Sequence, residues 1–304
     1  TGYSQFDLLQ KIRYQINDYM NIDANIQYST SSDIPRFDQL SLRDEVGLVP
    51  NFSEWNYGPQ DRFLASLKYK WIQDVRFWDE MIVIASFQDL QESRITRNFN
   101  SNFRELRIED VGVYGLTVDA NKKWKKNWSR SIFYGLDYNY NQVSSRASRE
   151  NIVNGTTDSE LFTRYPSGGS SANNFGAYVE LIHTTPDSVL NFHAGLRYSY
   201  FNTDVLFKPS DPIQWPDYFY DGIFSSNDAL TWSGGLNINA GKGWILNFLA
   251  STAFRSPNVD DIGKLRVKAD NLTVPNPELS AERTINFETN IQKRFSNFAE
   301  FNVT

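Results

Sequence analysis

Apolar and polar residues alternate with a period of two along most of this 304-residue chain. Leucine, isoleucine and tyrosine occupy most even positions from 8 to 16, and the even positions from 20 to 28 are again apolar. Because successive side chains of a β-strand point to opposite faces, this pattern predicts antiparallel strands with one apolar and one polar face. We count about twelve such strands, with further clear stretches at 63–71, 132–140, 190–200, 244–250 and 285–292.

The connections between the predicted strands alternate between short and long. A soluble sheet with one wet face also alternates in polarity, but it does not account for this regularity. Short turns at one end and long loops at the other are typical of an outer-membrane barrel, which is apolar outside and polar inside. We therefore predict an all-β fold, a transmembrane antiparallel β-barrel, with no proline inside a strand. The predicted short turns lie near 17–19, 72–76, 121–127, 184–188, 241–243 and 295–298, and the long polar loops near 30–61, 89–109, 142–173, 202–229 and 256–282.

Aromatic residues make up 15% of the chain although its mean hydropathy is −0.50. Apolar and polar side chains must therefore be separated locally, as they are in such strands. Tryptophans flank the predicted short turns, where an interfacial aromatic girdle is expected. These residues are Trp71, Trp78, Trp124, Trp128 and Trp244.

Charge and cysteine content exclude several classes of function. The formal net charge of −6 leaves no basic surface for a nucleic-acid partner. The chain has no cysteine, so disulfides and thiolate chemistry are excluded. No apolar run approaches the roughly 18 residues of a membrane-spanning helix. No serine-hydrolase, zinc-protease or phosphate-binding motif is present, and we predict that the protein is not an enzyme.

Two boxes that contain proline, FRSP at 254–257 and NPEL at 276–279, frame one long polar loop. Proline fixes its own φ and restricts the preceding residue, so both boxes stiffen the points where the loop leaves and rejoins the sheet. The segments FRSPNVDDIGK, VPNPELSAE and INFETNI follow in this order, after SSDIPRFDQL, EWNYGPQDR and TRYPSGGSS. In this ordered set the sequence resembles a TonB-dependent outer-membrane receptor of the Bacteroidetes type.

The resemblance implies a barrel of about 22 strands filled by an N-terminal plug domain. Residues 1–304 are then one partial outer-membrane barrel domain, without the plug and the remaining strands. The resemblance also implies active import of a specific ligand, often a ferric siderophore or haem. The implied partners are outer-membrane lipids, an inner-membrane TonB energising complex that acts through the plug, and a small-molecule ligand. Two alternatives stay open: a passive channel, and a receptor that works with a surface lipoprotein in peptide or glycan uptake.

In haem receptors with these boxes, a histidine between them is expected to ligate the iron. Residues 258–275 contain neither histidine nor tyrosine, which argues against haem ligation by this loop. The two histidines of the chain are assigned to opposite faces, since His193 shares the polar face with Arg197 whereas His183 lies with the apolar residues Val179 and Leu181. We expect them several residues out of register, about 13 Å apart at about 3.3 Å per residue. We predict no metal site and no cofactor.

Candidate ligand-binding residues lie in the long loops and beside the FRSP box. Arg255 has inward parity at the barrel mouth and suits an anionic ligand or plug carboxylates. Asp260 and Asp261 are either solvated loop charges or contacts for a cationic or hydroxylated ligand. Loop aromatics bind a ligand or partner, or they pack loop against loop. The predicted ligand-binding residues are Arg255, Asn258, Asp260, Asp261, Tyr57, Tyr165, Trp215, Tyr218 and Tyr220.

A second set of polar residues is predicted to line the barrel interior and face the plug. His193 shares the polar parity of its strand with Arg197. Glu288 and Gln292 have the same inward parity nearer the periplasmic side. We expect these four residues to contact the plug rather than the ligand.

Overall fold

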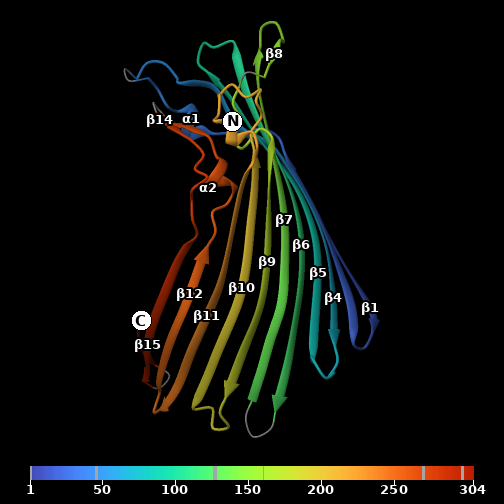
Figure 1. The fold of residues 1–304 in the computed structure, drawn as a ribbon, viewed down its shortest axis with the longest axis vertical. Helices are drawn as coiled ribbons and strands as arrows, with labels where there is room; N and C mark the ends of the chain where they lie inside the picture. The colour runs from blue at the N-terminus through green and yellow to red at the C-terminus, as the bar shows by residue number, and fades with distance from the viewer. Residues whose placement is uncertain (1, 45–46, 126–128, 160, 269–270, 296–297) are drawn as a thin grey trace.

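The computed structural model describes residues 2–44, 47–125, 129–159, 161–268, 271–295 and 298–304, and it contains one large antiparallel sheet (Figure 1). The main strands follow one another across the sheet in chain order, each paired with the next. This arrangement confirms the predicted all-β antiparallel fold. The main strands are β1 (Gln5–Asn17), β2 (Met20–Ser31), β4 (Phe52–Ile72), β5 (Glu80–Asn98), β6 (Phe103–Lys125), β7 (Ser129–Asn151), β9 (Gly169–Thr184), β10 (Leu190–Leu206), β11 (Ile223–Gly241), β12 (Trp244–Arg255), β15 (Glu282–Phe295) and β16 (Ala299–Val303).

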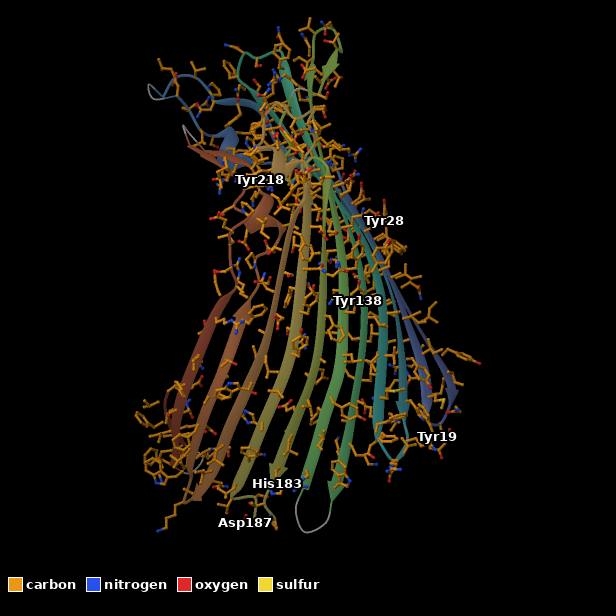
Figure 2. All side chains as sticks on the ribbon, in the orientation of Figure 1. Tyr19, Tyr28, Tyr138, His183, Asp187 and Tyr218 are labelled. Atoms are coloured by element: carbon orange, nitrogen blue, oxygen red, sulfur yellow. The ribbon has the colours of Figure 1, made fainter. Side chains whose placement is uncertain are left out.

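The two ends of the sheet differ in their connections. Short turns lie at the lower end of Figure 1, and the longer connections gather at the upper end. Figure 2 places Tyr19 and Asp187 at the turn end and Tyr218 at the loop end. The loop end also carries the short elements β3 (Ile34–Pro35), α1 (Phe37–Leu40), β8 (Thr157–Asp158), the 3₁₀ helix η1 (Asp217–Phe219), α2 (Val259–Gly263), β13 (Arg266–Lys268) and β14 (Asn271–Thr273).

The apolar parity of the strands forms the outer face of the sheet. Leu136, Leu196 and Tyr198 are 49%, 45% and 40% exposed. Apolar surface of this extent suits contact with lipid. The polar parity faces the other way: Ser29 on β2 and Thr203 on β10 line one cavity, which requires the sheet to curl around its polar face.

The strands extend further toward the loop end than the sequence pattern predicts. Residues 89–109, predicted as a long loop, belong to β5, a tight connection at 99–102, and β6. The predicted strict alternation of short and long connections is therefore wrong at this point. Beyond the lipid both faces of a strand meet water. The regular alternation of apolar and polar residues therefore weakens there, while the backbone hydrogen bonds between the strands continue. The long connections between main strands lie at 32–51, 152–168, 207–222 and 256–281.

A bulge in β4 changes which side chains point inward: odd-numbered residues do so before the bulge and even-numbered residues after it. The pairing of β4 with β5 shifts register between Tyr57 and Gln60. Gly58, within the bulge, has a φ of +93°, which a side chain would strain. Pro59 lies inside a strand, contrary to the prediction, but at a bulge, where sheets tolerate proline. Tyr57 and the even-numbered Arg62 consequently both line cavities on the inner face.

Some inner side chains lie flat across glycines of the neighbouring strand. A Cβ atom on Gly235 would come within 2.0 Å of Cε1 of His193. A Cβ atom on Gly176 would come within 2.0 Å of Nη2 of Arg197, which lies 2.9 Å from Oδ1 of Asp137. These glycines let large polar side chains rest against the inner wall.

The most deeply buried apolar cluster lies at the loop end. Phe207 and Ile262 are each 1% exposed. The cluster joins the connections 207–222 and 256–281 to the ends of β10 and β11, so these loops pack as one unit. Its buried members are Val205, Phe207, Phe219, Ile223, Ile262 and Leu265.

Four of the predicted girdle tryptophans lie near the turn end. Trp71 and Trp78 are in contact, with ring centroids 5.1 Å apart. Trp124 and Trp244 are exposed beside two other turns, whereas Trp128 lies outside the described residues. None of the described helices is long and apolar enough to cross a membrane.

Candidate functional site

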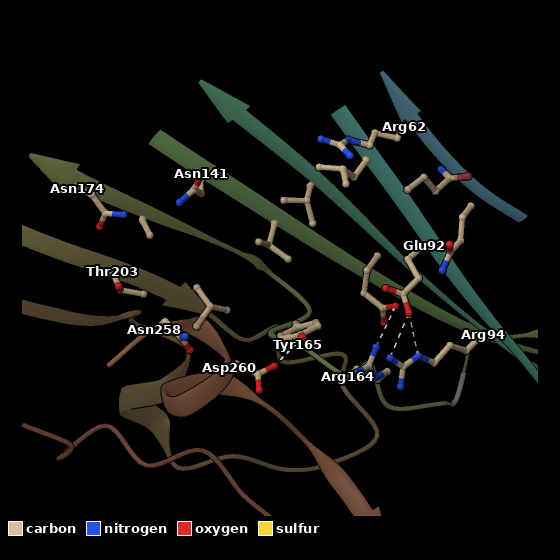
Figure 3. A pocket seen from close by; sticks show the side chains of 18 of the residues that line it. Arg62, Glu92, Arg94, Asn141, Arg164, Tyr165, Asn174, Thr203, Asn258 and Asp260 are labelled. Atoms are coloured by element: carbon tan, nitrogen blue, oxygen red, sulfur yellow. Dashed lines mark hydrogen bonds and ion pairs between the residues drawn. The ribbon is translucent and has the colours of Figure 1, made fainter. Parts of the chain in front are cut away.

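A cavity of about 700 Å³ lies at the loop end, between the polar face of the sheet and helix α2 (Figure 3). We name it the α2 cavity. The sheet supplies its wall, while Tyr165 and residues 256–260 come from two loops. Its volume is in the range of small-molecule sites, about 300–1,000 Å³. The wall combines amides, a hydroxyl and charges, among them Arg62, Glu92, Arg94, Asn141, Asn174 and Thr203.

Helix α2 begins with a reciprocal capping box. Oδ1 of Asn258 accepts a hydrogen bond from the backbone N–H of Asp261 at 3.0 Å. The Asp261 carboxylate accepts one from the backbone N–H of Asn258 at 3.1 Å. Both bonds satisfy donors that a helix N-terminus leaves unpaired. Asn258 thus starts the helix and lines the cavity, and Asp261 has a structural contact that the sequence did not predict.

Arg255 of the FRSP box closes the base of the same loop. Its Nη2 lies 2.6 Å from Oδ2 of Asp261, and its Nη1 lies 3.1 Å from Oε1 of Glu282. Because Glu282 is the first residue of β15, Arg255 connects the point where the loop leaves the sheet to the point where it returns. Arg255 and Asp261 are not lining residues of the α2 cavity, and their contacts fix the loop around it.

Tyr165 connects helix α2 to the segment between β7 and β9. Its hydroxyl donates to Oδ1 of Asp260 at 2.6 Å, and Nζ of Lys264 lies 2.6 Å from Oδ2 of the same carboxylate. Burial and the hydrogen bond to Asp260 raise the pKa of Tyr165 to about 12. Burial alone would raise the pKa of Asp260, but the hydrogen bonds from Lys264 and Tyr165 hold it below its ordinary value. Neutral tyrosine and ionised aspartate are therefore both favoured around neutral pH.

A second cavity of about 430 Å³ adjoins the first and shares Arg94 and Arg164 with it. Nη1 of Arg36 donates to the hydroxyl of Tyr57 at 2.5 Å within it. Tyr57, a predicted ligand contact, therefore belongs to this second cavity. We name it the arginine cavity, because its lining includes Arg36, Arg94, Arg107, Arg164 and Arg266.

The predicted aromatic residues in the connection 207–222 pack mainly against one another. The rings of Trp215 and Phe219 stack with centroids 5.3 Å apart. The hydroxyl of Tyr220 accepts a hydrogen bond from the backbone N–H of Trp215 at 2.8 Å. Tyr218 is 53% exposed at the loop end. Trp215 and Tyr220 thus take the loop-packing arrangement, and Tyr218 is accessible for contact.

The predicted lumen residues all lie on the polar face. Across adjacent strands His193 pairs with Gly235, Gly235 with Leu249, and Leu249 with Glu288, so His193 and Glu288 share one row. Gln292 lies nearer the turn end, opposite Ile245.

The two histidines are closer in register than predicted. His183 is opposite Phe192, so His193 is offset from it by one position and not by several. The estimate was wrong because the ladder of this hairpin starts directly at the turn, at Thr184 opposite Asn191. The two side chains still point to opposite faces. The described part of the chain contains no group of three or more potential metal ligands.

Sequence reasoning missed the arginines of the second cavity. Arg94 and Arg107 lie opposite each other on β5 and β6, within the segment that was predicted as a loop. The signal that could have identified them is their alternation with Ile95 and Ile108 along the two strands. Arg36, Arg164 and Arg266 lie in or beside loops, where no periodicity marks them.

Comparison with known proteins identifies similar chains. The family model described as "TonB dependent receptor-like, beta-barrel" matches residues 7–304. A search of curated proteins gives no match. Among solved structures, the Serratia marcescens hemophore receptor HasR, in complex with its hemophore HasA and heme, has a TM-score of 0.68 at 12% identity. The alignment covers 96% of this chain and 42% of that one.

Two further solved structures show the same fold. The copper transporter OprC has a TM-score of 0.74 at 10% identity, and the alignment covers 97% of this chain and 43% of that one. The siderophore receptor PiuA from Acinetobacter baumannii has a TM-score of 0.65 at 11% identity, with 96% and 48% covered. Identities this low show the fold alone. The chain spans less than half the length of these three proteins.

The fold and the family match lead to one assignment. The sheet is apolar outside and polar inside, and its longer connections gather at one end, as in outer-membrane barrels. The matched family consists of outer-membrane receptors and not of enzymes. This chain belongs to the TonB-dependent receptor-like β-barrel family.

Proposed function

We propose that the protein imports a specific ligand across the outer membrane and that the α2 cavity is part of its binding site. The observation that supports this function is the α2 cavity itself, which is covered by a helix whose Ile262 is fully buried. A passive channel needs an open path and has no use for such a cover. The similar solved structures are named as a hemophore receptor in complex with its hemophore and heme, a copper transporter and a siderophore receptor. A ferric siderophore or another iron or haem compound is therefore the proposed cargo.

The proposed mechanism places this chain in a larger protein of the Bacteroidetes type. Residues 1–304 form part of a barrel that holds a plug, and a TonB complex of the inner membrane acts on that plug. Loops capture the ligand, and inner residues such as His193, Arg197, Glu288 and Gln292 face the plug. Release requires that the ligand binds the plug states with different affinities.

Cooperation with a surface lipoprotein is a second proposal. Phe37 and Leu48, in the connection 32–51, are 64% and 79% exposed at the loop end. Exposed apolar residues in a long loop suit a protein partner. Replacing both with serine should reduce uptake by cells and leave the affinity of the purified receptor unchanged. Unchanged uptake would contradict the lipoprotein proposal.

Equilibrium binding of ferric siderophores and haem to the full-length receptor tests import. Ala172 lines the α2 cavity from β9, so the indole of Ala172→Trp should obstruct the cavity and abolish saturable binding. Ala177→Trp is the matched control, because Ala177 lies on the outer face of the same strand, opposite Tyr198. Absence of binding to every ligand, together with steady ion conductance, would replace import by the passive channel.

A further inference from the structure

The arginine cavity concentrates positive charge and aromatic rings. No carboxylate is among its described lining residues, although the whole chain has a net charge of −6. The carboxylates that pair with four of its arginines lie outside that lining. These carboxylates are Asp38, Glu92, Glu105 and Glu109.

The ion pairs use only part of the hydrogen-bonding capacity of these arginines. A guanidinium has five N–H donors. Among the described contacts, Arg107 donates through Nη1 to Glu105 at 3.0 Å, and Arg164 through Nη1 to Glu109 at 3.4 Å. The side chains of Arg107 and Arg164 are 15% and 14% exposed, so their charges are partly removed from water. An anion is attracted more strongly in such surroundings than in bulk solvent.

Aromatic rings hold the guanidinium groups in position. Arg94 lies 5.1 Å from the ring centroid of Tyr57, and Arg107 lies 5.1 Å from that of Phe162. Such stacking orients a planar guanidinium, whose edge matches the paired oxygens of a carboxylate or a catecholate. The same rings offer flat apolar surface to an unsaturated ligand.

The α2 cavity presents a different surface beyond Arg94 and Arg164. Figure 3 shows these two arginines at one end of the cavity and Asn141, Asn174 and Thr203 at the other. Amide and hydroxyl groups of this kind bind neutral polar groups. The two adjoining cavities therefore suit the two ends of a single ligand.

We propose that the ligand is an anion that carries carboxylate or catecholate oxygens. Its anionic end enters the arginine cavity, and its neutral amide or hydroxyl groups lie in the α2 cavity. This inference rests on the proposed import function and narrows its substrate class. A cationic ligand is repelled by the arginines of this cavity, and a neutral ligand gains less attraction from them than an anion does.

Binding of matched ferric chelates to the full-length receptor tests this substrate class. The panel contains an anionic catecholate chelate, an anionic citrate-type chelate, a neutral hydroxamate chelate and a cationic hydroxamate chelate. Arg107→Gln is suitable because its partner Glu105 keeps a second arginine, Arg149, at 3.7 Å. Arg164→Gln is less suitable because it would leave the buried Glu109 without that partner. The control is Arg146→Gln, because Arg146 on β7 pairs with Ile108 and therefore lies on the face of the sheet opposite to Arg107.

We expect saturable binding of one anionic chelate, weakened about tenfold by Arg107→Gln and by Arg266→Gln and unchanged by Arg146→Gln. The catecholate and citrate-type arms then distinguish the two oxygen donors. Binding of a neutral or cationic chelate alone, abolished by Ala172→Trp, would overturn the anionic class and leave the import function standing. An equal loss with Arg146→Gln would also overturn it. Binding of no chelate, with steady conductance, would remove the import function on which the inference rests.

Discussion

Replacing Ile262 with alanine tests whether one buried side chain holds helix α2 over its cavity. Ile262 is 1% exposed and packs in the cluster with Val205 and Phe207. Removing such a side chain costs about 2–5 kcal/mol in a packed site. The capping box contributes about 1 kcal/mol. The ion pair between Arg255 and Asp261 is partly exposed and adds about 1 kcal/mol or less.

The Ile262 side chain should therefore supply the larger part of the docking free energy. A loss of ~2 kcal/mol increases the open population about 30-fold. Amide hydrogen exchange at Leu265 reports this opening, because its N–H donates to the backbone oxygen of Arg164 when the helix is docked. We expect exchange there to accelerate by about that factor, with no change in the amides of β9 and β10.

Gly263→Ala disturbs the same contact in another way. A Cβ atom on Gly263 would lie 2.7 Å from Cγ of the buried Pro166, so the added methyl group should displace the helix. Leu48→Ala, at a residue that is 79% exposed, is the control and should have no effect. Unchanged exchange in both Ile262→Ala and Gly263→Ala would refute the reasoning that buried packing holds α2.

Three further predictions concern other contacts. The contribution of Asp260 to the docking of α2 is present above pH 3.8 and is lost as the pH falls through the lowered pKa of its carboxyl group. The contribution of Tyr165 is present below pH 10 and is lost as the pH rises through its raised pKa of about 12. A protection factor of the α2 amides, after correction for the intrinsic pH dependence of exchange, that stays constant across both ranges would contradict this. Glu54→Gln removes the carboxylate that two arginines of β5 and β6 approach at 2.8 Å and 2.7 Å, and it should destabilise this hairpin by about 1–2 kcal/mol in thermal unfolding, with an unchanged midpoint as the opposing result. Lys122→Met removes the ammonium group that holds the turn at 73–79, so exchange should accelerate in that turn and not in β9; equal exchange in both proteins would disprove its role.

The fold could be predicted where the environment imposes a period of two. Between lipid and the polar interior each strand needs one apolar and one polar face, so residues such as Leu196 and Arg197 identify both faces. Beyond the lipid this requirement ends, and the continuation of β5 and β6 through 89–109 keeps only isolated apolar residues such as Ile95 and Ile108. The bulge at Gly58 and Pro59 reverses parity within one strand, which a fixed period does not anticipate.

The candidate site could be predicted only in part. Tyr165, Asn258 and Asp260 line the α2 cavity, and Tyr57 lines the arginine cavity. The sequence could not separate Asp261 from these residues, because a carboxylate that caps a helix and one that meets a ligand differ only in backbone geometry. The arginine cavity is assembled from strands and loops far apart in the chain, and only their packing brings the charges together.

The glycines beneath the inner side chains also determine the calibre of the barrel. His193 and Arg197 lie against the wall only because Gly235 and Gly176 have no Cβ atom. A methyl group at either glycine would lift an imidazole or a guanidinium into the passage without changing the polarity of the wall. The free width along the polar face thus depends on residues that contribute no side chain of their own.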